Sequence, residues 1–195
     1  MKKILLLSII SLNFGTLFAQ SSTYWQQHVD YKMDVVMNVK NYQYKGKQEL
    51  VYTNNSSDTL KRVYYHLYNN AFQPGSEMDA RLQTIKDPDA RMVNKAKESR
   101  IKTLKPNEIG FLNVSNFKQD GAVAIAKTVG TILEVTLAKP ILPNSKTTFT
   151  LDFDGQVPVQ IRRSGRNNTE GIELSMAQWY PKIAEFDFEG WHADP

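Results

Sequence analysis

The segment from residue 29 to residue 39 alternates between apolar and polar side chains, and this pattern constrains the fold more than any other feature of the chain. Apolar residues fill its odd positions: Val29, Tyr31, Met33, Val35, Met37 and Val39. Lys32, Asp34 and Asn38 lie between them. A period of two over this length is typical of a β-strand that buries one face.

Further strand-like runs follow at 42–53, 60–68, 110–114, 123–126, 132–137 and 149–153. The polar run 54–58 has the composition of a turn, so the first three runs predict an antiparallel meander. Many short strands separated by turn residues are typical of sheets packed face to face. We therefore expect a mainly all-β fold, an antiparallel β-sandwich or saddle-shaped sheet.

One stretch, at about 75–109, breaks this pattern because it is charged and contains alanines. Within it, Pro88 disfavours helical geometry at Asp87, and this disfavours a single long helix. We expect a short helix, a break, and then a second short helix or a mobile loop. The stretch is interpreted as an insertion between strands, lying across the sheet edge or the surface.

The N-terminus has the order of a secretory signal peptide: Lys2 and Lys3, an apolar run at 4–10, and the small residue Ala19. We expect 1–19 to be removed and 20–195 to remain as one domain of about 175 residues. An uncleaved anchor is the alternative, but polar residues interrupt the run, which falls short of the ~20 apolar residues a bilayer span needs. The expected location is periplasmic, outer-surface or extracellular, with no membrane span after cleavage.

The amino-acid composition excludes several classes of protein. The sequence has no cysteine, which excludes a disulfide framework and fits an exported bacterial protein. Without the signal peptide, 22 basic residues face 20 acidic ones, which is no footprint for nucleic acid. Arg162, Arg163 and Arg166 cluster beside Gly165 and Asn167. We interpret this cluster as a solvated loop, with an anion contact as the alternative.

Catalytic motifs are absent from the sequence. The three histidines, His28, His66 and His192, are far apart, and no H-E-x-x-H helix pairs two of them for zinc. The sequence also lacks the G-x-S-x-G elbow of serine hydrolases and the phosphate-binding G-x-x-x-x-G-K loop. We therefore expect no catalytic residue, no metal site and no cofactor in this chain.

Acidic and aromatic residues gather near the C-terminus. Glu185, Asp187 and Glu189 alternate with Phe186 and Phe188, so the acids are predicted to share one strand face, as are Asp152 and Asp154. The three acids can attract a cation or a substrate amine, or simply be solvated above buried phenylalanines. The aromatic residues, from Trp179 and Tyr180 to Trp191, can line a pocket or form core.

Three passages follow one another in a recognisable order. The first combines HVDY at 28–31, YTNNS at 52–56 and the run 60–67; the second is LEVTLAKPILP at 133–143 with the strand-like 148–153 and Gly155; the third is AQWYP at 177–181 leading to Asp194 and Pro195. They resemble the N-terminal domain of the aminopeptidase N family of zinc peptidases, and together they span almost all of 20–195.

The resemblance implies a saddle of β-strands packed on a C-terminal catalytic domain, which would be the partner of this chain and bring it to a peptide substrate. Gln178 then corresponds to a glutamine at the rim of the substrate site. Tyr180 stands where the family often has a group that holds the peptide amine, and a phenol cannot supply a carboxylate charge. The family's zinc-binding residues have no counterpart here, so zinc is expected only in the missing catalytic domain.

Two functions are therefore open. The chain is either the non-catalytic N-terminal accessory domain of an exported zinc aminopeptidase-like protein, present as a fragment and inactive alone, or a free-standing secreted β-sandwich that binds a protein or glycan partner. A non-catalytic scaffold relative is a third possibility. The resemblance favours the first.

Overall fold

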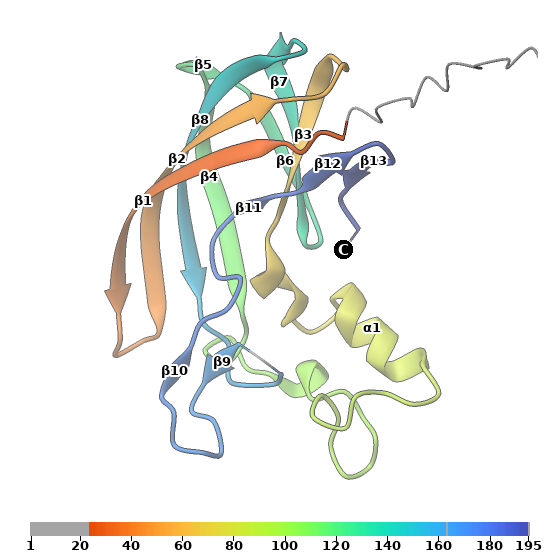
Figure 1. Cartoon of the computed structure of the whole chain (residues 1–195). Coiled ribbons are helices and arrows are strands. Elements are labelled where there is room, and N and C mark those ends of the chain that lie inside the picture. Colours follow the sequence, from red (N-terminus) through yellow and green to blue (C-terminus); the bar gives the residue numbers. More distant parts are fainter. Residues whose placement is uncertain (1–23, 163, 195) are drawn as a thin grey trace, which may run out of the picture.

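The computed structural model describes residues 24–162 and 164–194 and is built mainly from antiparallel strands (Figure 1). The predicted signal peptide at 1–19 lies outside these residues. One sheet has five strands in the order β1-β2-β8-β4-β5: His28–Asn38, Gln43–Asn54, Ser145–Gln156, Phe111–Gln119 and Ala122–Val123. The second has four, in the order β11-β3-β7-β6: Lys182–Ile183, Leu60–His66, Ile132–Ile141 and Ile125–Val129. The predicted fold class is confirmed.

The main core lies between the two sheets, and both contribute to it. Its largest fully buried side chains include Tyr44, Leu50, Tyr52, Tyr65, Phe149 and Leu133. On β2 these residues fall on even positions, which places the charged odd positions on the outer face. Strand alternation therefore explains how a chain rich in lysine and aspartate still buries a continuous apolar core.

Two glycines leave room for aromatic rings of the neighbouring strand to lie over them. Tyr44 lies directly opposite Gly155, and Gly46 lies directly opposite Phe153. A Cβ on Gly155 would lie 2.3 Å from Tyr44 Cζ, and one on Gly46 would lie 2.3 Å from Phe153 Cζ. Each ring thus lies over the opposite glycine, in space that any larger residue would fill.

The predicted three-strand meander is wrong in one respect, because β3 does not pair with β2. It pairs with β7 in the second sheet. The turn at 54–59 redirects the chain: the buried Asn54 amide donates to Asp58 O at 2.8 Å and to Leu142 O at 3.1 Å, and its oxygen accepts from Ser56 Oγ at 2.7 Å. These side-chain bonds close the turn and direct the chain away from β2.

The insertion contains the predicted short helix, α1 (Glu77–Thr84), capped by Ser76, whose hydroxyl accepts from Asp79 N at 3.2 Å. The helix ends before Pro88, as predicted. A second helix appears only as the three-residue 3-10 turn η2 (Ile101–Thr103). A small cluster of its own holds the insertion: Leu82, Met92 and Ile101 pack with Ile161. The insertion lies beyond one end of the sheets, not across a sheet edge (Figure 1).

The remaining elements are short. The 3-10 turn η1 (Tyr68–Ala71) follows β3, and two small hairpins lie in the last third of the chain: β9 (Gly165–Arg166) with β10 (Leu174–Ser175), and β12 (Glu185–Asp187) with β13 (Gly190–His192). None of the helices in the described part of the chain is long and apolar enough to cross a bilayer.

Candidate functional site

The C-terminal segment is fixed to the second sheet through β11. Lys182 and Ile183 pair with His66 and Tyr65, and Ala184 N donates to Tyr64 O at 2.8 Å. The turn that contains Gln178 and Tyr180 precedes this strand, and the β12–β13 hairpin follows it. Both candidate regions of the sequence are thus positioned by the same two-residue strand.

Gln178 lies in the left-handed region, with φ of 57°, and it is exposed. The core holds its neighbour: Tyr44 Oη donates to Trp179 O at 2.6 Å and accepts from Asn69 Nδ2 at 3.0 Å. Burial raises the pKa of Tyr44 above its ordinary value, so its hydroxyl remains a donor. A left-handed backbone at a residue other than glycine is sparsely populated and is kept only where the surroundings enforce it.

Replacing Tyr44 with phenylalanine is expected to loosen the Gln178 turn. The change leaves the Trp179 carbonyl and the Asn69 amide without their buried partner, at a cost of about 1–3 kcal/mol in the free energy of unfolding. Amide hydrogen exchange at 177–180 should accelerate more than exchange in β2. Uniform acceleration in both places would show that the bond does not hold the turn.

Tyr180 packs against β1. Its ring meets the Tyr31 ring edge-on at a centroid distance of 5.5 Å, and Tyr31 Oη accepts from Ile183 N at 2.9 Å. Burial raises the pKa of Tyr31 above its ordinary value. Tyr180 therefore presents an aromatic ring packed on Tyr31 and a partly exposed phenol. It cannot contribute the anionic charge that would pair with an ammonium group.

A groove of about 910 Å³ lies along β11, whose Lys182 and Ile183 line it, and we call it the aromatic groove. It is lined by Trp25, Tyr52, His66, Tyr68, Phe186 and Phe188, among others. The prediction that C-terminal aromatic residues line a pocket is thus correct for Phe186 and Phe188. Trp179, Tyr180 and Trp191 are not lining residues. Trp191 packs on Phe186 with ring centroids 5.0 Å apart.

Histidine 66 forms one wall of the aromatic groove. Its ring stacks on Tyr68 at a centroid distance of 4.9 Å and an interplanar angle of 11°, and its Nε2 bonds His192 O at 3.0 Å. Burial lowers the pKa of His66 below its ordinary value. The neutral imidazole is thus favoured near neutral pH, so the part of the wall formed by His66 and Tyr68 is aromatic. Lys182, Glu185 and Asp187 also line the groove and give it charged groups.

The three histidines have separate partners. His28 Nε2 lies 3.2 Å from Asp30 Oδ1 on the surface, His66 bonds a backbone carbonyl, and His192 Nε2 lies 2.8 Å from Asp187 Oδ2. Within residues 24–162 and 164–194, His192 is the histidine that groups with two carboxylates, those of Asp187 and Glu189. The three rings do not converge on one point.

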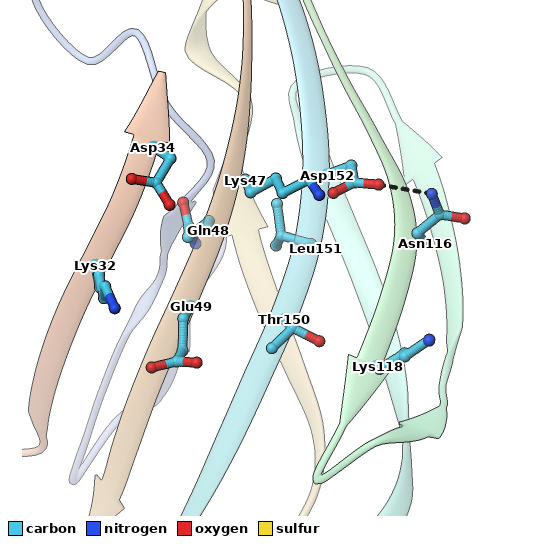
Figure 2. Close-up of a pocket in the computed structure, with 10 residues that line it drawn as sticks. All are labelled: Lys32, Asp34, Lys47, Gln48, Glu49, Asn116, Lys118, Thr150, Leu151 and Asp152. Atoms are coloured by element: carbon cyan, nitrogen blue, oxygen red, sulfur yellow. Dashed lines mark hydrogen bonds between the residues drawn. The ribbon is translucent and has the colours of Figure 1, made fainter. Parts of the chain in front are cut away.

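The outer face of the five-stranded sheet carries alternating charges (Figure 2). Lys47 lies between Asp34 on β1 and Asp152 on β8, and the next row holds Lys32, Glu49 and Thr150. Asp152 and Asp154 share this face as predicted, and they accept from Asn116 Nδ2 at 2.7 Å and from Asn113 Nδ2 at 3.2 Å. Opposite charges that face each other across strands stabilise a sheet. We interpret this face as a solvated charge ladder.

The arginine cluster is not a uniformly solvated loop, so that interpretation is wrong for Arg166. Its side chain is 8% exposed, lies over the Tyr42 ring with Cζ 4.2 Å from the centroid, and donates to Val157 O at 3.3 Å and to Asn107 O. Arg162 is exposed, with Nε 3.5 Å from Asp89 Oδ2. Arg163 lies outside the described residues.

Comparisons with known proteins give structural neighbours only. No protein family and no curated protein matches the chain. Among solved structures it is similar to an M1 zinc metallopeptidase from Deinococcus radiodurans, with 16% identity and a TM-score of 0.46 over 78% of this chain and 26% of that one. It is also similar to a mutant two-domain M1 zinc metallopeptidase with bound L-arginine, with 16% identity and a TM-score of 0.46 over 80% of this chain and 27% of that one. The chain spans about a quarter of the length of these neighbours.

Proposed function

We propose that this chain is the non-catalytic N-terminal accessory domain of an exported zinc aminopeptidase-like metallopeptidase, and that Gln178 and Tyr180 contribute to the rim of its substrate site. The three ordered passages described above motivate the proposal. The observation that carries it is the Gln178 turn, where an exposed amide sits on a left-handed backbone held by Tyr44. Four of the seven described non-glycine residues with positive φ are asparagine or aspartate, which tolerate this conformation, whereas Gln178, Tyr42 and Lys97 do not belong to that class. Such strain is concentrated at functional positions.

At the rim, each residue has a limited chemical role. The Gln178 amide offers two donors and an acceptor, which suits the backbone of a peptide. Tyr180 offers ring area and a phenol. Neither can activate water, and the residues of this chain do not fit a catalytic zinc, because no two histidines lie on one helix face. The partner in this proposal is a C-terminal catalytic domain, which would hold the metal.

Exposed apolar residues support a partner surface. Val123 and Ile125 are 77% and 74% exposed along the adjoining edges formed by β5 and β6, and Phe188 is 86% exposed at the hairpin tip. Val123 and Ile125, which are close in sequence, and the hairpin tip at Phe188 are two separate exposed apolar positions, and apolar surface of this kind is what another domain or protein covers.

The purified 195-residue chain is expected to show no EDTA-sensitive hydrolysis of an aminoacyl anilide. The physical reason is that the sequence lacks the H-E-x-x-H helix, in which two histidines hold zinc and a glutamate lies beside the metal-activated water. The complete reading frame should continue in frame to an H-E-x-x-H sequence. In its protein product, replacing Gln178 with alanine should lower kcat/KM about tenfold, because the change removes one hydrogen bond to the substrate.

Gln83 provides the matched control, because it is exposed on α1, far along the chain from the Gln178 turn. Its replacement with alanine should leave kcat/KM unchanged. Hydrolysis by the isolated chain, or equal kinetic effects of the Gln178 and Gln83 changes, would contradict the proposal.

The aromatic groove favours a second candidate, a free-standing module that binds a protein or glycan. Its volume and its rings suit a ligand with flat apolar faces. A stop codon directly after Pro195, together with a cooperative melt as a monomer, would favour this function. Self-association and strong binding of a hydrophobic dye would favour the accessory domain.

A further inference from the structure

The β12–β13 hairpin brings metal-ligating atoms together on one face. Glu185 lies directly opposite His192, and Asp187 lies two residues further along β12. Glu189 lies in the two-residue turn that joins Asp187 to Gly190, and not in a strand as the alternation predicted. Phe186, on the other face, is buried in the main core. The apolar face thus fixes the hairpin and leaves its polar face outward.

Three of these side chains form a compact donor set. The ligand atoms of Asp187, Glu189 and His192 all lie within 4.8 Å of one another, and His192 Nε2 is 2.8 Å from Asp187 Oδ2. Donor atoms bound to one zinc ion at about 2.0–2.2 Å are roughly 3–3.5 Å apart. The spacing therefore accommodates an ion after small side-chain movements.

Backbone contacts hold two of the three ligands in place. Asp187 Oδ1 accepts from Glu189 N at 2.8 Å, which leaves Oδ2 to face His192. The His192 carbonyl bonds His66 Nε2 at 3.0 Å, which ties β13 to the wall of the aromatic groove. Such contacts reduce the freedom that an ion would otherwise have to remove on binding.

The local charge also favours a cation. The carboxylates of Asp187 and Glu189 lie beside the His192 imidazole, and Glu185 lies directly opposite His192 on the paired strand. One imidazole with carboxylates suits zinc and related transition metals, whereas calcium and magnesium prefer oxygen ligands alone.

We propose that Asp187, Glu189 and His192 form a surface site for one divalent transition-metal ion of the zinc class, with water completing its coordination. This site binds the two strands of the hairpin to each other at the mouth of the aromatic groove. The alternation of Glu185, Asp187 and Glu189 indicates a face that can attract a cation, but it does not connect His192 to these acids, because the two-residue turn that pairs the strands has no sequence signal.

The test uses the purified 195-residue chain, treated with a chelator and then dialysed. Titration with zinc chloride in a calorimeter should show one ion per chain. The His192→Ala and Glu189→Gln variants should each bind zinc at least about tenfold more weakly. In NMR spectra, zinc should shift the His192 ring signal and leave the His66 ring signal in place, which is readily followed because the sequence has only three histidines.

His28→Ala is the matched control, because His28 also pairs with an exposed aspartate but lacks a third ligand in the described residues. This variant should bind zinc as the unchanged chain does. Glu189 lies in an exposed turn, so Glu189→Gln tests the site even if His192→Ala weakens folding. Absence of one-to-one binding, or equal affinity in the Glu189→Gln variant and the unchanged chain, overturns the proposal.

Discussion

Replacing Gly155 with alanine is expected to reduce the free energy of unfolding by about 3 kcal/mol, a large loss for one added methyl group. The new Cβ would lie 2.3 Å from Tyr44 Cζ and 2.4 Å from Tyr44 Oη. Tyr44 cannot easily withdraw, because its hydroxyl is bonded to Trp179 O and Asn69 Nδ2. For a chain of this size the melting temperature should fall by roughly 6–12 °C.

A double-mutant cycle separates this collision from a general effect of alanine. With Tyr44 replaced by leucine, the Gly155→Ala change should cost much less, since the ring that it strikes is gone. Gly171→Ala is the backbone control: its φ is 84° and no atom lies within 4 Å of the added Cβ, so only conformational strain of about 1–2 kcal/mol is expected. Additive losses in the cycle would show that the Tyr44 ring is not the obstacle.

Replacing Arg166 with alanine is expected to lower the free energy of unfolding by about 3–4 kcal/mol. The guanidinium is buried, donates to the carbonyls of Val157 and Asn107, and covers the Tyr42 ring. Its removal leaves two buried acceptors unpaired and opens a cavity. Because Asn107 belongs to the insertion and Val157 follows β8, the loss should also weaken the attachment of the insertion to the sheets.

Two further variants sharpen this prediction, both measured by denaturant unfolding. Arg166→Lys keeps the charge but cannot reproduce the planar, forked donor, so it should recover only part of the loss. Arg162→Ala removes an exposed arginine from the same stretch and should change stability little. Equal effects of the Arg162 and Arg166 changes would show that burial of Arg166 does not contribute.

The alternation of apolar and polar residues over 29–39 predicts a strand from the sequence alone, and this strand matches β1 closely (His28–Asn38). Strands too short to show such alternation could not be predicted from the sequence. The strands β11, β12 and β13 contain two or three residues each, too few for a pattern of period two to show. The departure of β3 from the first sheet depends on the Asn54 amide reaching Leu142, a contact 88 residues away in sequence.

The candidate site shows the same division. Gln178 and Tyr180 were selected through resemblance, and their role in substrate binding stays a prediction. The left-handed backbone at Gln178 had no sequence signal, because glutamine rarely adopts it. The pairing of His192 with Asp187 also had no sequence signal. The two residues are five positions apart, and they meet only because a two-residue turn sets the register of the hairpin. Burial of Arg166 likewise depends on Tyr42, which is remote in sequence.

The insertion packs on its own apolar cluster, and this separation has a consequence for cooperativity. Leu82, Met92 and Ile101 make their core with Ile161 and not with the side chains between the sheets. The segment can therefore open as a sub-global unit while both sheets stay folded. Its amides would then exchange at a free energy below that of complete unfolding, and a protease could nick it without dismantling the sandwich.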